Sequence, residues 1–244
     1  MGLLDSVFGK SKVNAANKKV KAAREANDPV ALEKALAGAI TIYQSIGSDS
    51  SVFKDALYSW GMALLYSARL KRGAEAVSLY EEAGKKFSFC LVAKPDYLAA
   101  ALDWSVALME LAALQKGAAQ TASYALAKEK LTLADSIHEG VASYNFACLH
   151  AVEGDFDACK AALELARDYK NLPDEQDILN DADMQVAKTQ NWFDGFIASI
   201  NAPVKADAKT EELSAEGAEA KKTGAVYTKN QVKTDGYKVK YDDK

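Results

Sequence analysis

Apolar side chains recur every three or four residues along most of this chain, which is the spacing that places them on one face of an α-helix. Short polar breaks separate these stretches, as at Asn27-Asp28-Pro29 and at Lys94-Pro95-Asp96. Because aspartate caps helix N-termini and proline ends one helix or fits the first turn of the next, each break predicts a helix boundary. The expected helices cover about 12–27, 29–46, 52–70, 74–88, 97–115, 119–137, 141–153 and 156–169, with shorter helical pieces to about residue 200.

Two of these stretches have nearly the same sequence when they are aligned 44 residues apart. Residues 55–68 and 99–112 each contain a Trp, then a small residue, then Ala-Leu and a further alanine one turn later. A third and more divergent copy covers residues 141–149. Self-similarity at this period predicts stacked pairs of helices, since one pair cannot bury its apolar face alone.

The best single copy combines Tyr144-Asn145-Phe146-Ala147-Cys148 with Gly154-Asp155-Phe156-Asp157 and then Leu163 and Ala166. This combination resembles the tetratricopeptide repeat (TPR) superfamily. In the middle copies of this chain the helix–helix turns are longer than the family's consensus, so membership of a related helical-repeat family is the alternative. The resemblance implies an all-α fold over residues 11–200, as a short right-handed solenoid with C-terminal capping helices. The earlier copies match through Leu57, Trp60, Gly61, Leu64, Ala76, Tyr80 and Ala83, and through Trp104, Ser105 and Leu108.

The same resemblance implies a concave groove, lined by the first helix of each pair, that binds a segment of a partner protein. The implied function is a non-catalytic scaffold or adaptor, and Met and Tyr suit such a surface. The alternative is that these side chains pack inside the protein itself. The positions that match the family's groove are Tyr58, Met62, Leu65, Tyr66, Leu102, Val106, Met109, Tyr144, Cys148 and Val152.

Residues 1–10 form an expected amphipathic segment of their own. At helical spacing Leu3, Leu4, Val7 and Phe8 share one face, and Gly2 with Ser6 fits the N-myristoylation pattern. The alternative function is therefore a peripheral membrane protein recruited by this segment, or an assembly factor for a larger complex. Basic residues follow that could add electrostatic attraction to a membrane, namely Lys10, Lys12, Lys18, Lys19, Lys21 and Arg24.

Composition narrows the class of protein. The net charge of -4 over 244 residues provides no general basic field, so nucleic-acid binding is not expected. Three cysteines without a framework spacing indicate free thiols, which favours a cytoplasmic location, either free or peripheral to a membrane. Aliphatic residues become rare after about residue 201, so residues 201–244 are predicted to be a disordered, charged tail.

Candidate chemistry is sparse, and we predict no catalytic residue, metal or cofactor. The two histidines, His138 and His150, are expected to be structural, because Cys148 and His150 lie two apart on a helix and face different ways. The acidic run Asp174, Glu175, Asp177, Asp181 and Asp183 lacks the glycine and closing glutamate of a calcium loop. We therefore interpret that run as helix-capping residues and solvated surface charge.

Overall fold

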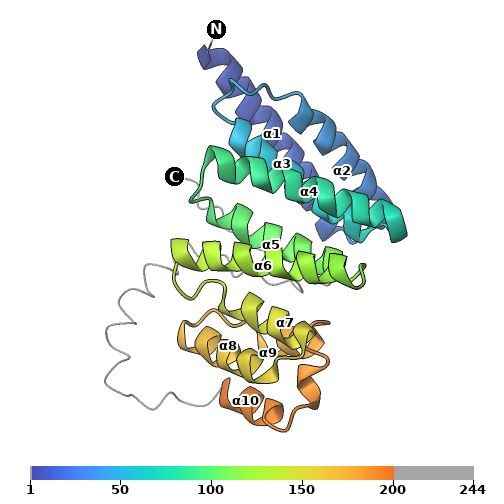
Figure 1. Cartoon of the computed structure of the whole chain (residues 1–244). Coiled ribbons are helices and arrows are strands. Elements are labelled where there is room, and N and C mark those ends of the chain that lie inside the picture. The colour runs from blue at the N-terminus through green and yellow to red at the C-terminus, as the bar shows by residue number, and fades with distance from the viewer. Residues whose placement is uncertain (1, 201–244) are drawn as a thin grey trace. The chain divides into compact units, whose positions relative to one another are not determined.

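A computed structural model shows an all-α protein and describes the backbone of residues 2–200 and the side chains of residues 9–200 (Figure 1). The predicted tail, residues 201–244, lies outside the described residues. The helices are α1 (Gly2–Glu25), α2 (Pro29–Gln44), α3 (Phe53–Arg69), α4 (Gly73–Ala93), α5 (Leu98–Ala112), α6 (Ala118–Ile137), α7 (Ser143–Glu153), α8 (Phe156–Asp168), α9 (Glu175–Asn180), the 3₁₀ turn η1 (Ala187–Thr189) and α10 (Phe193–Ile200).

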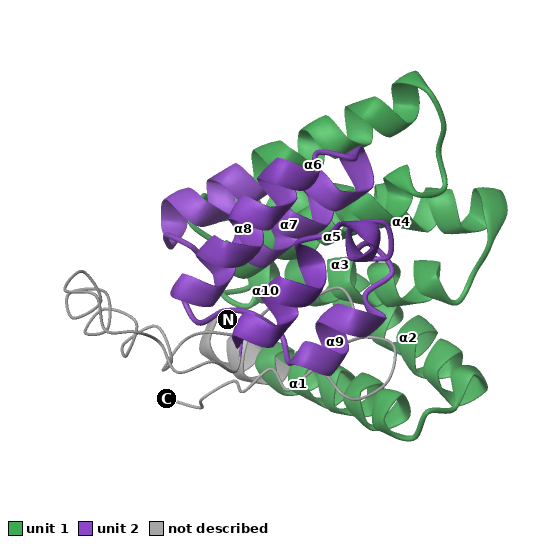
Figure 2. Ribbon diagram, turned by 90° about the horizontal axis from the view of Figure 1, so that it is seen from below, with its two compact units in different colours: residues 1–130 green, residues 131–244 purple. Residues whose placement is uncertain are grey.

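The chain divides into two compact units, and the division falls within α6, after Lys130 (Figure 2). Unit 1 covers residues 1–130, and in it each helix packs on its neighbour in the sequence, α1 on α2, α2 on α3, α3 on α4 and α4 on α5. Unit 2 covers residues 131–244, and in it α7 packs on α8, while α10 contacts α8 and η1. The architecture is thus a series of sequential antiparallel helix pairs.

Local sequence signals set several helix boundaries. The side chain of Asp28 accepts hydrogen bonds from the backbone amides of Val30 and Ala31, at 2.9 and 3.1 Å, and Pro29 occupies the first turn of α2. Gly154 ends α7 with a φ of 81°, a left-handed conformation that costs glycine little. The other predicted boundaries are close to the observed ones, except that α1 begins ten residues earlier than predicted and α4 continues past residue 88 to Ala93.

α1 is one continuous helix rather than a short segment followed by a second helix. It runs from Gly2 to Glu25, so residues 2–10 of the predicted segment continue directly into the rest of α1. Its buried stripe consists of Gly9, Val13, Ala16 and Val20. The predicted membrane-contacting side chains, Leu3, Leu4, Val7 and Phe8, lie outside the described side chains.

The repeat seen in the sequence is also a repeat of contacts. Lys86 Nζ lies 3.9 Å from the centre of the Trp60 ring, and Lys130 Nζ lies 4.4 Å from the centre of the Trp104 ring. Both members of the second pair are 44 residues further along the chain than those of the first. The same offset relates two fully buried residues, Phe87 and Leu131. The helix packing is therefore repeat-like in the second helices as well, where the sequence similarity is weak.

Two glycines allow close contacts between helices in unit 1. A Cβ atom on Gly61 would lie 2.7 Å from the ring of Phe87, and one on Gly84 would lie 2.9 Å from Trp104 Nε1. Gly84 thus lets α4 approach the indole of α5, and Trp104 packs between these helices.

Candidate functional site

The structure buries most of the side chains that were predicted to line a groove. Met62 and Val152 are partly exposed, whereas the other eight of the ten are buried, with exposed fractions of 7 % or less. Other parts of the chain therefore cover most of these positions, and their role in binding a partner stays a prediction. The eight buried residues are Tyr58, Leu65, Tyr66, Leu102, Val106, Met109, Tyr144 and Cys148.

In unit 1 one of these residues belongs to a buried polar pair. The hydroxyl of Tyr58 on α3 donates a hydrogen bond of 2.6 Å to Asp103 Oδ2 on α5, and Asp103 is 1 % exposed. Burial raises the pKa of Asp103 to about 7, although the hydrogen bond from Tyr58 and the charge of Arg69 act in the opposite direction. The Tyr58 ring also packs on the ring of Tyr97, with 5.2 Å between centroids.

A second carboxylate of α5 lies two turns further on and is held by charge. The guanidinium of Arg69 donates to both oxygens of Glu110, at 2.8 and 2.7 Å, and the Tyr80 hydroxyl donates to Oε2 at 2.8 Å. Desolvation and the charge of Glu110 raise the pKa of Tyr80. We call Tyr58, Arg69, Tyr80, Asp103 and Glu110 the α5 network, because both acids come from that helix and their partners come from α3 and α4.

α1 adds an aromatic contact beside this network. The guanidinium carbon of Arg24 lies 4.3 Å from the centre of the Tyr66 ring, and that of Arg69 lies 5.5 Å from it. The pKa of Tyr66 is raised because the side chain is buried, although the charges of Arg24 and Arg69 act in the opposite direction. Tyr66 is therefore enclosed by cationic side chains from α1 and α3, which explains its low exposure.

An apolar pocket with a volume of about 330 Å³ opens between α4, α5 and α6 in unit 1. Phe89 at its edge is 56 % exposed, and Val92, one turn further along α4, is 79 % exposed. The predicted groove used only the first helix of each pair, whereas six of the ten lining residues of this pocket lie on α4, the second helix of its pair. The pocket is lined by Tyr80, Glu81, Gly84, Lys85, Ser88, Phe89, Trp104, Leu108, Leu111 and Leu126.

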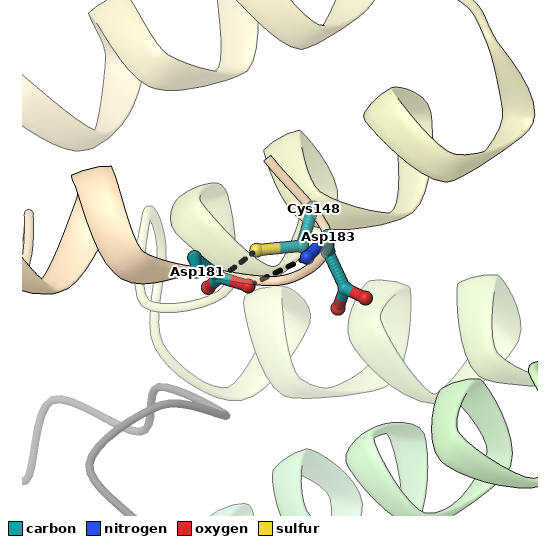
Figure 3. A group of neighbouring side chains, drawn as sticks. All are labelled: Cys148, Asp181 and Asp183. Carbon is teal, nitrogen blue, oxygen red and sulfur yellow. Dashed lines mark hydrogen bonds between the residues drawn. The ribbon is translucent and has the colours of Figure 1, made fainter. Parts of the chain in front are cut away.

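In unit 2 the residues Cys148, Asp181 and Asp183 lie together and are all buried (Figure 3). Asp181 Oδ2 accepts hydrogen bonds from the Tyr144 hydroxyl at 3.0 Å and from the Cys148 thiol at 3.6 Å. Asp181 Oδ1 accepts from the backbone amide of Asp183 at 2.9 Å. The interpretation of the acidic run as solvated charge is wrong for Asp181 and Asp183, which are buried. They lie just after α9, where the hydrogen bonds of Asp181 hold the chain against α7.

This cluster offers the kinds of donor atom that bind zinc, since one ligand atom of each residue lies within 4.8 Å of the others. Asp181 already uses both oxygens as acceptors for groups of α7 and of its own turn. Figure 3 shows the Asp183 carboxylate directed away from the thiol–carboxylate pair. The hydrogen bonds therefore support a structural role, which is to hold residues 181–183 against α7.

No family model, no curated protein and no solved structure matches this chain. Among the described residues, every helix is too short or too polar to cross a lipid bilayer. The class of protein that the fold defines is an all-α protein built from antiparallel helix pairs.

Proposed function

We propose that this chain is a TPR-like scaffold that binds an apolar segment of a partner protein in the pocket between α4, α5 and α6. The observation that supports this function is the exposure of Phe89 beside an apolar pocket. Exposed apolar surface that borders a concave site is typical of protein interaction sites. The pocket replaces the predicted groove residues as the site to test, because most of those side chains are buried.

The lining of the pocket defines the chemistry of the proposed occupant. Leucines and Trp104 form apolar walls, while Glu81 and Lys85 supply charge of both signs at α4. A volume of about 330 Å³ is at the small end of the roughly 300–1,000 Å³ that ligand pockets span. It suits one large apolar side chain of a helical or extended segment, anchored as in other helical peptide-binding proteins.

The three cysteines support a reducing compartment such as the cytoplasm. Cys90, Cys148 and Cys159 are buried thiols that form no disulfide. Free buried thiols are common in proteins of reducing compartments. The proposed scaffold function is non-catalytic.

Two variants test the pocket in different ways. Phe89→Ala removes the exposed aromatic ring, and Ser88→Trp adds a bulky side chain to the pocket lining. Leu165→Ala is the matched control, because Leu165 is an apolar residue of similar exposure, 45 %, on α8 of the other unit. Affinity capture with quantitative mass spectrometry identifies partners, and calorimetry with each purified partner then measures its dissociation constant.

The expected result is a partner that binds the wild type and the control equally and binds both pocket variants at least about tenfold more weakly, which is the size of a hot-spot effect. Because Phe89 is exposed, Phe89→Ala should leave the circular dichroism spectrum and thermal midpoint nearly unchanged. Partners that bind both pocket variants with wild-type affinity would overturn the proposal.

A further inference from the structure

The outer side of α1 is a strongly basic surface on a chain that is acidic as a whole. Five lysines of this helix are exposed. The sequence contains no Asp or Glu between Asp5 and Glu25, whereas the whole chain has a net charge of -4. α1 contains six basic and two acidic residues, so this helix has a net positive charge although the chain as a whole is negative. The exposed lysines are Lys10, Lys12, Lys18, Lys19 and Lys21.

Contacts with neighbouring helices fix which side of α1 faces outward. Val13, Ala16 and Val20 are buried, with exposed fractions of 4, 1 and 8 %. Asn17 accepts a hydrogen bond from the Tyr43 hydroxyl on α2 and donates one of 3.3 Å to Ser59 Oγ on α3. These contacts prevent α1 from rotating about its axis, so the lysines stay on the exposed sides.

The helical register places apolar residues on the same outer side. α1 is helical from Gly2 onward, so each residue adds about 100° of rotation. Positions 3, 4, 7 and 8 therefore centre about half a turn away from the buried stripe at positions 9, 13, 16 and 20, in line with Lys18. The residues at those four positions are Leu3, Leu4, Val7 and Phe8.

We infer that the outer side of α1 binds the surface of an anionic lipid bilayer. Lysines attract anionic headgroups, and neighbouring apolar residues on the same side can enter the interface between headgroups and acyl chains. A nucleic acid or an acidic protein would use the lysines but would leave the apolar positions without a role. The combination of both features on one side of one helix favours the bilayer.

This inference goes beyond the proposed scaffold function, because no residue of the pocket lies on α1. The two surfaces can therefore be tested independently. A chain held at a bilayer through α1 would present its pocket to partners near that bilayer.

The test uses the full chain and two kinds of vesicle, one of phosphatidylcholine with phosphatidylserine and one of phosphatidylcholine alone. Flotation measures the bound fraction. One variant combines Lys12→Gln, Lys18→Gln and Lys19→Gln, and another combines Leu4→Ser with Phe8→Ser. The matched control changes three exposed lysines outside both α1 and the pocket, Lys54, Lys116 and Lys170, to glutamine.

The wild type and the control should bind the anionic vesicles and not the neutral ones. Each lysine near an anionic surface changes affinity by roughly a factor of five, so the α1 lysine variant should bind at least about tenfold more weakly. The serine variant should also bind the anionic vesicles more weakly at low salt, although all of its lysines are unchanged.

Three results would overturn the inference. The wild type could fail to bind anionic vesicles, or the α1 lysine variant could bind as well as the control. The third is a chain that binds double-stranded DNA as tightly as vesicles and is insensitive to the serine changes. That result would make the lysine side a general polyanion site.

Discussion

Glu110 in unit 1 and Asp181 in unit 2 are both buried carboxylates with several hydrogen-bond donors, but the kinds of donor differ. In unit 1 the donors to Glu110 include the guanidinium of Arg69 and the hydroxyl of Tyr80. In unit 2 the donors to Asp181 include the Tyr144 hydroxyl, the Cys148 thiol and a backbone amide. The first arrangement contains a buried ion pair, and the second contains neutral donors.

The difference reflects which structural elements each carboxylate connects. Glu110 joins α5 to α3 and α4, so the ion pair specifies how consecutive helix pairs meet. Asp181 joins the turn after α9 to α7, so its hydrogen bonds attach an irregular segment to the last regular pair. Charged hydrogen bonds are stronger than neutral ones, but the loss of one partner leaves an uncompensated charge.

The largest effect is expected from Arg69→Met. This change leaves the carboxylate of Glu110, which is 8 % exposed, without its guanidinium. Removal of one partner of a buried pair costs about 3–5 kcal/mol, and we expect a loss of free energy of unfolding in that range. Urea denaturation followed by circular dichroism measures it.

A second variant separates the charge from the loss of packing. Arg69→Met combined with Glu110→Leu removes both charges and should recover at least half of the lost stability. Lys71→Met is the control, because Lys71 pairs with Glu33 and Glu75 at the surface and its loss should hardly change the midpoint. A double variant as unstable as Arg69→Met would show that the ion pair is not what matters at this position.

The second prediction concerns pH. The pKa of Asp103 is about 7 in the folded chain, against about 3.9 for an unfolded aspartate. The folded state therefore favours the protonated acid, so this contribution to stability is fully present below about pH 4 and is lost as the pH rises through about 7.

Asp103→Asn removes this titration while keeping an oxygen that can accept from Tyr58. We expect the variant to gain stability relative to the wild type between about pH 4 and pH 8, by about 1 kcal/mol or more. Denaturation curves at a series of pH values measure the difference. The control Asp96→Asn changes an exposed aspartate, and its curve should stay parallel to that of the wild type. A parallel curve for Asp103→Asn would contradict the prediction.

The smallest effect should come from one of the two cysteines of unit 2. Cys148→Ser replaces the thiol that donates to Asp181 with a better donor and should cost less than about 1 kcal/mol. Burial raises the pKa of Cys159 to about 12, which indicates surroundings that solvate a polar group poorly. Cys159→Ser should therefore cost about 1–3 kcal/mol. Thermal denaturation of the two variants gives the order, and the reverse order would argue against the role assigned to Asp181.

Most of the helical pattern could be predicted from the sequence because helix boundaries depend on local chemistry. Asp28 and Pro29 begin α2, and Gly154 ends α7, through contacts within a few residues of each boundary. The offset of 44 residues between Trp60 and Trp104 likewise indicated equivalent positions in consecutive helix pairs. The end of α4 was placed too early, although no glycine or proline interrupts residues 88–93 and the break at Pro95 marks the observed end.

The candidate site could not be predicted in the same way, because exposure depends on every element that packs around a residue. Tyr66 is on the first helix of its pair, yet Arg24 from α1 covers its ring. Tyr58 is enclosed by Tyr97 and Asp103, which come from a later part of the chain. Periodicity identifies the apolar side of a helix but not how many neighbours cover it.

The sequence by itself determined that this chain forms repeated helical pairs and where most of the helices begin and end, since propensity, capping and periodicity act over a few residues. Only the tertiary structure decided which of those residues face the solvent. It buried Asp103, Glu110 and Asp181 by placing donors from distant helices against them, and it left Phe89 exposed beside a pocket. The physical reason is that burial and pairing depend on contacts between residues that are far apart in the chain.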